Sequence, residues 1–487
     1  MKKIIAFLAA IVIVTVLLQV VSAQEARFTG TVVTVADNPS RPLAALVKSE
    51  VDKLVGGDNN VVWAGYQLTV RPSMRRALIN WTYNEKGHHV HITSGHYESS
   101  VDGIERVYSD SKNLLFKFTS GSTTHPQSVM MYDSDEQYKT SRPVVWITGV
   151  TSSRSLSMVK SFIDSAPGEE ARSMLMGVIA AHPGREPQDY LVNKVRSGES
   201  MKVRKQGLFW YGQTLDGEEL GELPAFETEF KDIELRKHLV FVYHDLESKA
   251  GLQRLVHIAK TDQDEEVVEQ AIFWIGQTDG VDTVDLLKDL YDKSKSVRIK
   301  EKVIFSLSQT EDERALDVLS DIATGDPDEN IREKAIFWIG QHDDEQVALQ
   351  KLKDIYSGNL PKGVRKKLVF SASQIDISES LDFLADVAMK DDDLGLRREA
   401  AFWIGQHDDE SEALSFLKRI YGQETDQQTK EKIIFSVSQI ETDDAARFLL
   451  ELAKTEQNKE LRQKALFWLT QTESDVAVDY IETVLDK

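Results

Sequence analysis

The sequence contains no cysteine. This absence excludes disulfide bonds, cysteine-ligated zinc, a thiol nucleophile and a lipidated amino-terminal cysteine. Proline is also scarce, with 11 residues in 487, while the hydrophobic share of 41% and the charged share of 28% are ordinary. Such a composition excludes a collagen-like fibre and a wholly disordered chain. The length predicts about three domains or one long repeat array.

Catalytic signatures are missing as well. The chain has no HExxH zinc motif, no GxSxG nucleophile elbow and no glycine-rich phosphate-binding loop. We therefore predict a non-enzymatic protein with no catalytic residues and no cofactor. A hydrolase with an unrecognised site in residues 24–150 remains an alternative, because repeated units repeat for packing rather than for chemistry.

Basic residues are the minority, and the net charge is −21. Residues 24–150 are balanced, with 13 basic and 13 acidic side chains, whereas residues 151–487 hold 43 basic and 66 acidic ones. An acidic excess of this size repels phosphate backbones, so we expect no nucleic-acid partner. It favours a basic or cationic protein partner, with association that weakens in salt.

Long apolar runs are confined to the amino terminus. Lysines at positions 2 and 3 precede an apolar run over residues 4–21, and a small-residue cleavage site ends at Ala23. We predict a signal peptide over residues 1–23 and a periplasmic or secreted protein. A retained anchor is the alternative, because a run of about 18 apolar residues is just long enough to span a bilayer. No second membrane span is expected.

A seven-residue pattern recurs through the last two-thirds of the chain. The segment AIFWIGQ occupies residues 271–277 and 335–341, and related segments such as VIFSLSQ lie between them. The closing glutamine recurs every 32 or 33 residues. A period of this length is typical of solenoids built from stacked supersecondary units. We predict an α-solenoid over residues 151–487, with about nine to ten units of paired helices.

The pattern also alternates from one unit to the next. Tryptophan occupies the fourth position of the segment at residues 274, 338, 403 and 468, and serine fills the same column at 306, 371 and 436. We expect a large residue in one unit to lie beside a small one in the next, so that the layers interdigitate.

The pattern resembles HEAT repeats of the short type first named from phycobilin lyases. The residues that carry the resemblance follow one order in a typical unit, namely Ile331, Arg332, Ala335, Ile339 and Gly340. The whole chain looks like exported bacterial HEAT-repeat proteins of unassigned function. The resemblance implies the fold and a role as a protein–protein interaction scaffold. It does not imply lyase activity, because the thiol chemistry of bilin attachment needs cysteine.

Columns of phenylalanine and glutamine flank the apolar stripe of the predicted second helices. We predict that they reach the binding surface, along which a partner would lie. The alternative is that they only pack between units. The predicted binding residues are Phe273, Gln277, Phe305, Gln309, Phe337, Gln341, Phe370, Gln374, Phe402 and Gln406.

A basic residue recurs near the start of the predicted second helices, after a turn crowded with acids such as Asp391 to Asp393. We interpret this pattern as a structural ladder of ion pairs that ties the turns together. A cation strip for an acidic ligand is the alternative, although the neighbouring acids would neutralise it. The ladder residues are Arg204, Arg236, Lys300, Arg332, Arg365, Arg397, Lys430 and Arg462.

Residues 24–150 differ in character from the repeats. One amphipathic helix over residues 43–55 precedes several β-branched and aromatic runs. We predict a small α+β domain of about five or six antiparallel strands that caps the first unit of the solenoid. A helix over residues 475–485 is expected to cap the other end.

Histidines gather in this small domain. His89 and His91 would point to the same face of a strand, and His96 could return across a turn as a third metal ligand. A periplasmic metal- or small-ligand-binding protein is therefore an alternative function. The plainer interpretation is a solvated strand face. A second histidine motif, Gln-His-Asp-Asp at residues 341–344 and 406–409, is expected to cap helices.

Overall fold

The computed structural model describes two compact units, Met1–Ile258 and Ala259–Lys487, which are treated separately below. The described residues are 28, 31–56, 59–74, 78–82, 89–93, 110–134, 140–166, 168–197, 200–278 and 283–485, with the backbone alone for 78–82 and 89–93. The predicted signal peptide, residues 1–23, lies outside them. Within the described ranges, no helix is both long and apolar enough to cross a bilayer.

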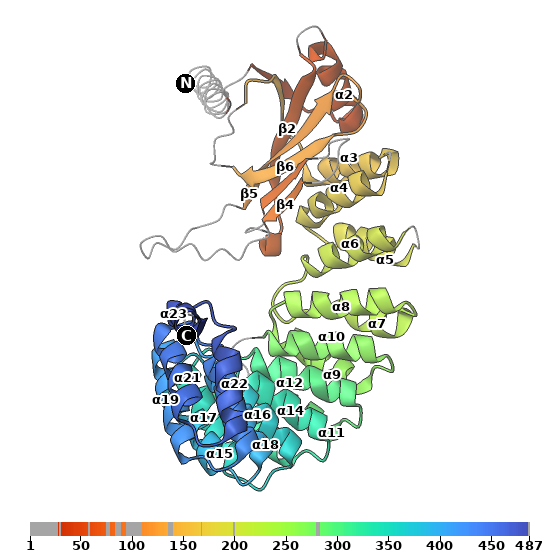
Figure 1. Ribbon diagram of the computed structural model, residues 1–487. Coiled ribbons are helices and arrows are strands. Elements are labelled where there is room, and N and C mark those ends of the chain that lie inside the picture. Colours follow the sequence, from red (N-terminus) through yellow and green to blue (C-terminus); the bar gives the residue numbers. More distant parts are fainter. Residues whose placement is uncertain are drawn as a thin grey trace, which may run out of the picture. The chain divides into compact units, whose positions relative to one another are not determined.

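The first unit is built around a seven-stranded sheet (Figure 1) of order β1-β7-β2-β5-β6-β3-β4. The strands are β1 (Val32–Ala36), β2 (Val61–Thr69), β3 (Leu78–Thr82), β4 (His89–Thr93), β5 (Ser111–Thr119), β6 (Ser128–Asp133) and β7 (Val144–Thr148). Strand β7 pairs in parallel with both β1 and β2. The predicted α+β fold and most of the antiparallel pairings are confirmed, but the expected five or six strands omit β1. The predicted direction is wrong for β7, because the alternation within a strand does not reveal its partner or direction.

Three helices lie along one side of this sheet (Figure 1): α2 (Leu43–Leu54), α3 (Ser152–Ser165) and α4 (Glu169–Ala181). The ring of Phe162 on α3 meets Phe116 and Phe118 of β5 edge-on, with centroids 5.6 and 6.1 Å away. Strand β2 reaches β5 closely at Gly65, where a Cβ would lie 2.5 Å from the carbonyl oxygen of Leu114. The contacts of Phe162 show that the sheet packs directly on α3.

A buried arginine joins the end of β2 to the ends of two helices. Arg71 is only 6% exposed. Its guanidinium donates to the carbonyl oxygens of His182 at 3.1 Å, Gly184 at 2.7 Å and Thr214 at 2.8 Å. These carbonyls follow α4 and α6 (Met201–Gly212), where the last turn of a helix leaves acceptors unpaired and its dipole favours a cation. The side chain of Arg71 therefore ties the sheet to the ends of α4 and α6.

Substituting this arginine tests the junction. Arg71→Met keeps an apolar stem but removes every donor, so we expect the free energy of unfolding to fall by about 3–5 kcal/mol. Denaturant titration followed by circular dichroism measures the change. Arg185→Met is the matched control, because Arg185 is 85% exposed and forms only a 3.7 Å ion pair with Asp189. An Arg71→Met chain as stable as this control would contradict the assignment.

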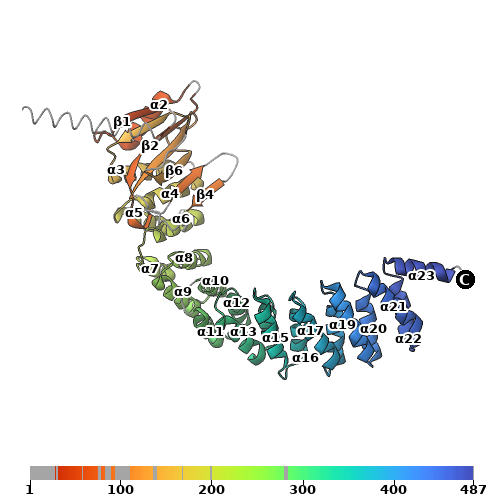
Figure 2. The same cartoon turned by 90° about the vertical axis from the view of Figure 1, so that its left-hand side faces the viewer.

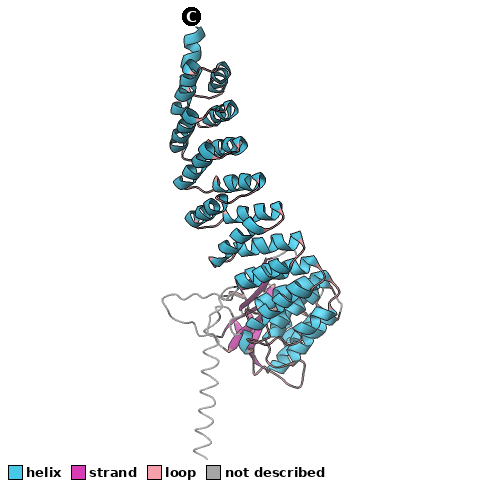
Figure 3. Cartoon of the chain, turned by 90° about the horizontal axis from the view of Figure 1, so that it is seen from below, coloured by secondary structure: helices cyan, strands magenta, loops and turns pink. Residues whose placement is uncertain are grey.

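Paired helices fill the rest of the described chain (Figure 2). We call the two members of a pair the first and the second helix. After α3 and α4 the pairs are α5 (Glu186–Arg196) with α6, α7 (Leu223–Glu229) with α8 (Ile233–Asp245), α9 (Lys249–Thr261) with α10 (Glu265–Gly276), α11 (Thr283–Lys293) with α12 (Val297–Ser308), α13 (Arg314–Gly325) with α14 (Glu329–Ile339), α15 (Glu345–Tyr356) with α16 (Lys362–Ala372), α17 (Ser378–Lys390) with α18 (Leu394–Ile404), α19 (Glu410–Gln423) with α20 (Gln427–Val437), and α21 (Asp443–Thr455) with α22 (Lys459–Leu469). The pairs of the second unit stack in successive layers (Figure 3), which confirms the predicted α-solenoid.

Aspartates begin many of these helices. The carboxylate of Asp344 accepts the N–H of Val347 at 3.1 Å and so caps α15. The preceding His342 accepts the N–H of Asp344 on its Nδ1 at 3.0 Å. The second copy of the motif, residues 406–409, repeats both bonds at the start of α19. The Gln-His-Asp-Asp motif is therefore a turn and a helix cap.

We call the contact between two successive second helices a joint. At every other joint of the second unit, the two helices approach each other very closely. A Cβ on Gly276 of α10 would lie 2.8 Å from the Cβ of Ser306 on α12. Only a glycine facing a small side chain permits such an approach without a clash. We call these contacts tight joints. They are Gly276–Ser306, Gly340–Ser371 and Gly405–Ser436.

The alternate joints are filled by aromatic rings. Trp338 of α14 meets Phe305 of α12 edge-on, with centroids 5.2 Å apart. The same contact joins Phe370 to Trp403 at 5.3 Å and Phe435 to Trp468 at 4.9 Å. The alternation of tryptophan and serine therefore has a different cause from the one expected: the glycines lie against the serines, and the tryptophans against the phenylalanines.

A methyl group added at a tight joint should destabilise the array. In Gly405→Ala the new Cβ would lie 2.7 Å from the carbonyl oxygen of Ser436, so we expect the free energy of unfolding to fall by about 1–3 kcal/mol. Gly422→Ala is the matched control, because nothing lies within 4 Å of its Cβ position in α19. Alanine's higher helix propensity should make that control neutral or more stable by up to about 1 kcal/mol. Equal melting temperatures for the two variants would refute the tight joint.

The last helix, α23 (Asp475–Leu485), packs against α21. It leaves part of α22 uncovered, since Phe467 is 53% exposed and Leu466 is 38% exposed. The helix predicted over residues 475–485 is therefore present, but it caps the end of the array only in part.

Candidate functional site: the second-helix face

The second helices of the C-terminal unit turn one narrow face away from the core. On α10, α12, α14, α16, α18, α20 and α22 this face comprises each repeat glutamine and the residues four, seven and eight positions before it. We call it the second-helix face. All ten predicted binding residues lie on it: Phe273, Phe305, Phe337, Phe370 and Phe402 are half-buried, and Gln277, Gln309, Gln341, Gln374 and Gln406 are exposed.

A lysine lies over two phenylalanine rings at each tight joint. The Nζ of Lys302 is 4.8 Å from the ring centre of Phe273 and 4.9 Å from that of Phe305. These two rings are almost parallel, 6.4 Å apart with 12° between their planes. The negative faces of aromatic rings attract a cation placed over them. We call the three copies Phe–Lys–Phe clusters: Lys302 with Phe273 and Phe305, Lys367 with Phe337 and Phe370, and Lys432 with Phe402 and Phe435.

Burial beside the rings has an electrostatic effect on these lysines. Each one is half-buried, and the partial loss of water lowers the pKa of the ammonium groups of Lys302, Lys367 and Lys432 below the usual lysine value. The described residues give these lysines no ion pair. The charges of these lysines are therefore attracted by Glu269, Glu333 and Glu399 without a direct ion pair.

A hollow of about 560 Å³ adjoins the third cluster. Its lining residues are Lys362, Lys366, Gly395, Arg398, Glu399, Phe402 and Lys432. Three of its four cations are already paired, in Lys362–Asp393 at 2.8 Å, Lys366–Glu399 at 3.2 Å and Arg398–Asp426 at 3.5 Å. The fourth, Lys432, has only its two ring contacts among the described residues. The hollow thus has one cation left to attract an anion.

Charges of opposite sign are segregated in this unit. The six second helices from α12 to α22 carry 16 lysines and arginines but only 6 acidic residues. The six first helices from α11 to α21 carry 10 basic and 15 acidic residues. These totals include the ladder cations, and α10 carries three acidic and no basic residues. The second-helix face itself carries seven basic and five acidic residues from α10 to α22, so its charge is nearly balanced and does not share the acidic excess of the whole array.

The predicted ladder residues point to the opposite edge of the second helices. Lys300 forms a 2.6 Å ion pair with Asp326 in the turn of the next repeat, and the hydroxyl of Tyr291 donates to the same carboxylate at 2.6 Å. Arg365 and Asp391 form the same contact two repeats later, at 2.8 Å. The same arrangement recurs in Arg397–Glu424 at 3.0 Å and Lys430–Glu456 at 3.9 Å, while Arg204 and Arg462 donate to the backbone carbonyls of Val195 and Glu456. Arg332 likewise donates to the carbonyl of Asp326, whereas Arg236 is half-buried on α8.

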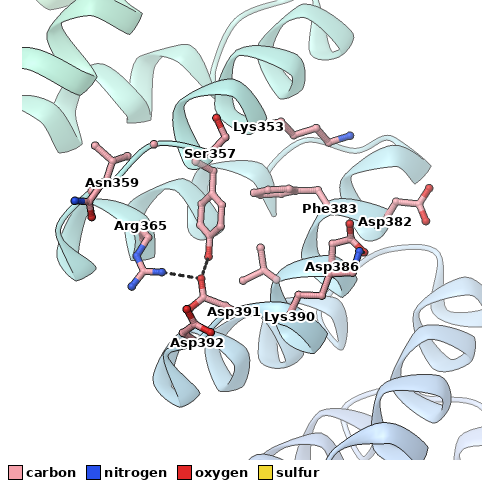
Figure 4. A pocket seen from close by; sticks show the side chains of 14 residues that line it. Lys353, Ser357, Asn359, Arg365, Asp382, Phe383, Asp386, Lys390, Asp391 and Asp392 are labelled. Carbon is pink, nitrogen blue, oxygen red and sulfur yellow. Dashed lines mark hydrogen bonds and ion pairs between the residues drawn. The ribbon is translucent and has the colours of Figure 1, made fainter.

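A groove of about 880 Å³ lies beside this ladder, between α15 and α17 (Figure 4). Arg365 and Asp391 meet in it, and Phe383 supplies an apolar wall. At its rim, Asp386 and Lys390 form a 2.8 Å ion pair. These charges satisfy one another, which is the arrangement that a structural ladder requires.

The carboxylate of Asp326, which Lys300 and Tyr291 share, makes the stability of the ladder depend on pH. Burial alone would raise the pKa of Asp326, but hydrogen bonds from Lys300, Tyr291 and the N–H of Asp328 outweigh it and hold this pKa below its usual value. A carboxyl group with a depressed folded pKa contributes its full stabilisation above the unfolded pKa, about 3.9. The contribution is lost as the pH falls through the folded value.

Asp326→Asn should therefore have a pH-dependent effect. We expect it to lower the free energy of unfolding by about 1–3 kcal/mol at pH 7, because two donors lose a charged acceptor. The difference from the parent should begin to shrink as the pH falls below about 4 and should vanish only below the depressed folded pKa, where the parent carboxyl is also neutral. Denaturant titration at several pH values measures this. Asp321→Asn is the control, since Asp321 is 76% exposed with its lysine 4.0 Å away. A penalty independent of pH would contradict the ionic ladder.

The predicted metal ligands are only partly described. The backbones of His89 and His91 lie in β4, opposite Thr82 and Asn80 of β3. His96 lies outside the described residues. Among the residues whose side chains are described, no group of three or more potential metal ligands occurs.

A serine and a histidine do meet in the first unit, but in a buried position. The Oγ of Ser155 is 2.7 Å from Nε2 of His182 and 2.6 Å from the hydroxyl of Tyr66. All three side chains are buried between the sheet and the helices. Burial lowers the pKa of His182 to about 4, so the imidazole is neutral at pH 7. Since no substrate can reach these groups, they stabilise the junction.

Sequence reasoning missed the lysines of the Phe–Lys–Phe clusters. Their signal is a 65-residue step between Lys302, Lys367 and Lys432, each directly before an apolar-apolar-Phe-Ser run. In the sequence they look like Lys334, which occupies the same column but is 52% exposed and pairs with Glu301 at 3.7 Å. The difference arises only when two second helices come close enough for their rings to stack.

Comparisons with known proteins agree with this architecture. Residues 252–340 and 381–470 match the sequence family of HEAT repeats. No curated protein sequence matches the chain. Human deoxyhypusine hydroxylase in complex with glycerol is 16% identical and covers 50% of this chain and 96% of its own, with a TM-score of 0.24. The Escherichia coli protein YibA is 18% identical over 55% of this chain and 97% of its own, with a TM-score of 0.27.

Kap121p bound to Pho4p is 12% identical and covers 68% of this chain and 40% of its own, with a TM-score of 0.27. These structural similarities are too low to carry a functional argument. The family match covers helices on both sides of α15 and α16, which continue the same pairs, caps and joints. The matched segments of this chain, residues 252–340 and 381–470, are therefore HEAT repeats.

Proposed function

We propose that this chain is an exported, non-enzymatic scaffold that holds a partner protein along its second-helix face. One observation carries the proposal: half-buried phenylalanines and exposed glutamines keep one register from α10 to α20. Rings that are partly exposed offer contact area at low entropic cost, and the amides offer hydrogen bonds along an extended segment. The proposed export rests on the basic start and apolar run of residues 1–23.

The charge of the partner follows from the face that it contacts. A partner on the second-helix face meets a surface on which seven basic residues slightly outnumber five acidic ones. A basic partner, as the net charge of the sequence suggests, would instead meet the acidic first helices and turns. The register of the phenylalanines and glutamines supports the second-helix face.

Site-specific cross-linking distinguishes the two faces. A photoreactive amino acid is placed in the full chain at Gln341, Gln374 or Gln406, and at exposed first-helix positions Asp317 or Asp386 as controls. In an envelope extract of the native host, we expect one common protein to be cross-linked from the three glutamine positions and not from the two aspartates. Products of equal yield from both faces would contradict the proposal.

The captured protein then has to bind the purified chain through the same face. Gln341→Arg/Gln406→Arg introduces bulk and charge at two exposed positions, so we expect its affinity to fall by about tenfold or more. Gln350→Arg is the control, because Gln350 is an exposed glutamine on first helix α15. Calorimetric titration measures each Kd. An unchanged Kd in the double variant would show that the partner binds elsewhere.

A further inference from the structure

The Phe–Lys–Phe clusters repeat one geometry along the second-helix face. Lys367 has its Nζ 4.8 and 4.5 Å from its two ring centres, and Lys432 has its Nζ 4.1 and 4.5 Å from its own pair. Among the described residues of the second unit, the clusters occur at every second helical pair, where a tight joint brings two phenylalanine rings under one lysine. Packed helices lie about 8–10 Å apart, so successive lysines are roughly 16–20 Å apart along the stack.

Glu269, Glu333 and Glu399 attract the cluster lysines, but among the described residues they form no ion pair with them. Glu269, beside Lys302, pairs with Arg298. Glu399, beside Lys432, pairs with Lys366 at 3.2 Å. Among the described residues the cluster lysines have ring contacts and no ion pair. They differ in this from the cations in the same column of the alternate helices, because Lys334 pairs with Glu301 and Lys464 lies 4.0 Å from Glu431.

Ring contacts also fix where the charge lies. A lysine that lies over two rings has already lost much of the freedom of its side chain. Less entropy is therefore lost when an anion binds it. The third cluster opens into the 560 Å³ hollow, which gives an acidic side chain room to approach Lys432. A carboxylate could lie there beside the ammonium while its own chain runs over the exposed glutamines.

We propose that the three Phe–Lys–Phe clusters bind an extended acidic segment of a partner protein whose carboxylates are spaced to match every second helical pair. This inference rests on the proposed scaffold function and names the partner's chemistry. An extended chain advances about 3.3 Å per residue, so a spacing of roughly 16–20 Å corresponds to about five or six residues. The segment would present an acidic cluster at each such step, with uncharged residues between.

A continuous polyanion fits this face less well. Carboxylates of Glu269, Glu333 and Glu399 lie close to the cluster lysines and would repel phosphates placed between them. The chain as a whole carries a net charge of −21, which opposes the approach of a nucleic acid. A segment with separated carboxylates brings fewer negative charges near these glutamates and near the acidic chain, so both penalties are smaller for it.

The test uses the purified full chain and a fluorescent 18-residue peptide. The peptide carries three Glu-Glu pairs, each followed by a four-residue Gly-Ser spacer. Two control peptides replace the glutamates by glutamines or gather all six glutamates at one end. We expect binding, measured by fluorescence anisotropy, that is at least threefold tighter for the spaced peptide than for the clustered one. It should weaken as salt rises.

Two double variants separate the cluster lysines from ordinary surface lysines. Lys367→Met/Lys432→Met removes two cluster charges, and Lys334→Met/Lys464→Met removes two charges from the same helix column outside the clusters. We expect the first to weaken peptide binding by at least tenfold and the second by less than threefold. Lys367→Arg/Lys432→Arg keeps both the charge and the stacking, so its Kd should stay within threefold of the parent. Melting temperatures confirm that all three variants are folded.

Several results would overturn the inference. These are no binding of the spaced peptide, equal losses in the two methionine double variants, or tighter binding of duplex DNA than of the peptide. The proposed scaffold function would survive such a failure if cross-links from Gln341, Gln374 and Gln406 still trapped one common protein. If those cross-links failed as well, both proposals would fall.

Discussion

The close approach of second helices at the tight joints is the constraint on which the rest of the solenoid depends. Where Gly276 faces Ser306, the two backbones come near enough for Phe273 and Phe305 to lie almost parallel, and one lysine can cover both rings. At the next joint Trp338 meets Phe305 edge-on. The composition of the exposed face therefore follows from backbone spacing in the core.

The N-terminal unit shows that the spacing, and not the lysine, creates the stacked rings. Gly212 faces Val242 there, and Phe209 and Phe241 stack with centroids 6.3 Å apart and 18° between their planes. The group that lies over Phe241 is His238, at 5.8 Å. Burial lowers the pKa of His238 to about 4, so this copy carries no charge at neutral pH. The stacked arrangement of the two rings is retained, but the group over them is neutral instead of positively charged.

The repeat period, the paired helices and the helix-capping aspartates could be predicted because each leaves a local, repeated signal in the sequence. The partner of a strand could not: β7 pairs in parallel with β1 and β2, and nothing within Val144–Thr148 specifies that direction. The charge of the binding face was hidden for a similar reason, since the sum over residues 151–487 averages acidic turns and first helices with a face whose charge is nearly balanced. Lys302 and Lys334 look alike in sequence, and only a tight joint separates their environments.

Regular spacing gives this face a way to select a partner without any single strong site. An ion pair on an exposed surface contributes only about 0–1 kcal/mol, so one Phe–Lys–Phe cluster alone would hold an acidic segment weakly. Three clusters in register make the second and third contacts intramolecular, with an effective concentration set by the chain between the carboxylates. A segment with the wrong spacing gains one contact and must stretch or loop to gain the next. Selectivity would then depend on the distance between acidic clusters in the partner. That distance has to match the spacing of the Phe–Lys–Phe clusters, which is set by the alternation of tight joints with joints filled by tryptophan.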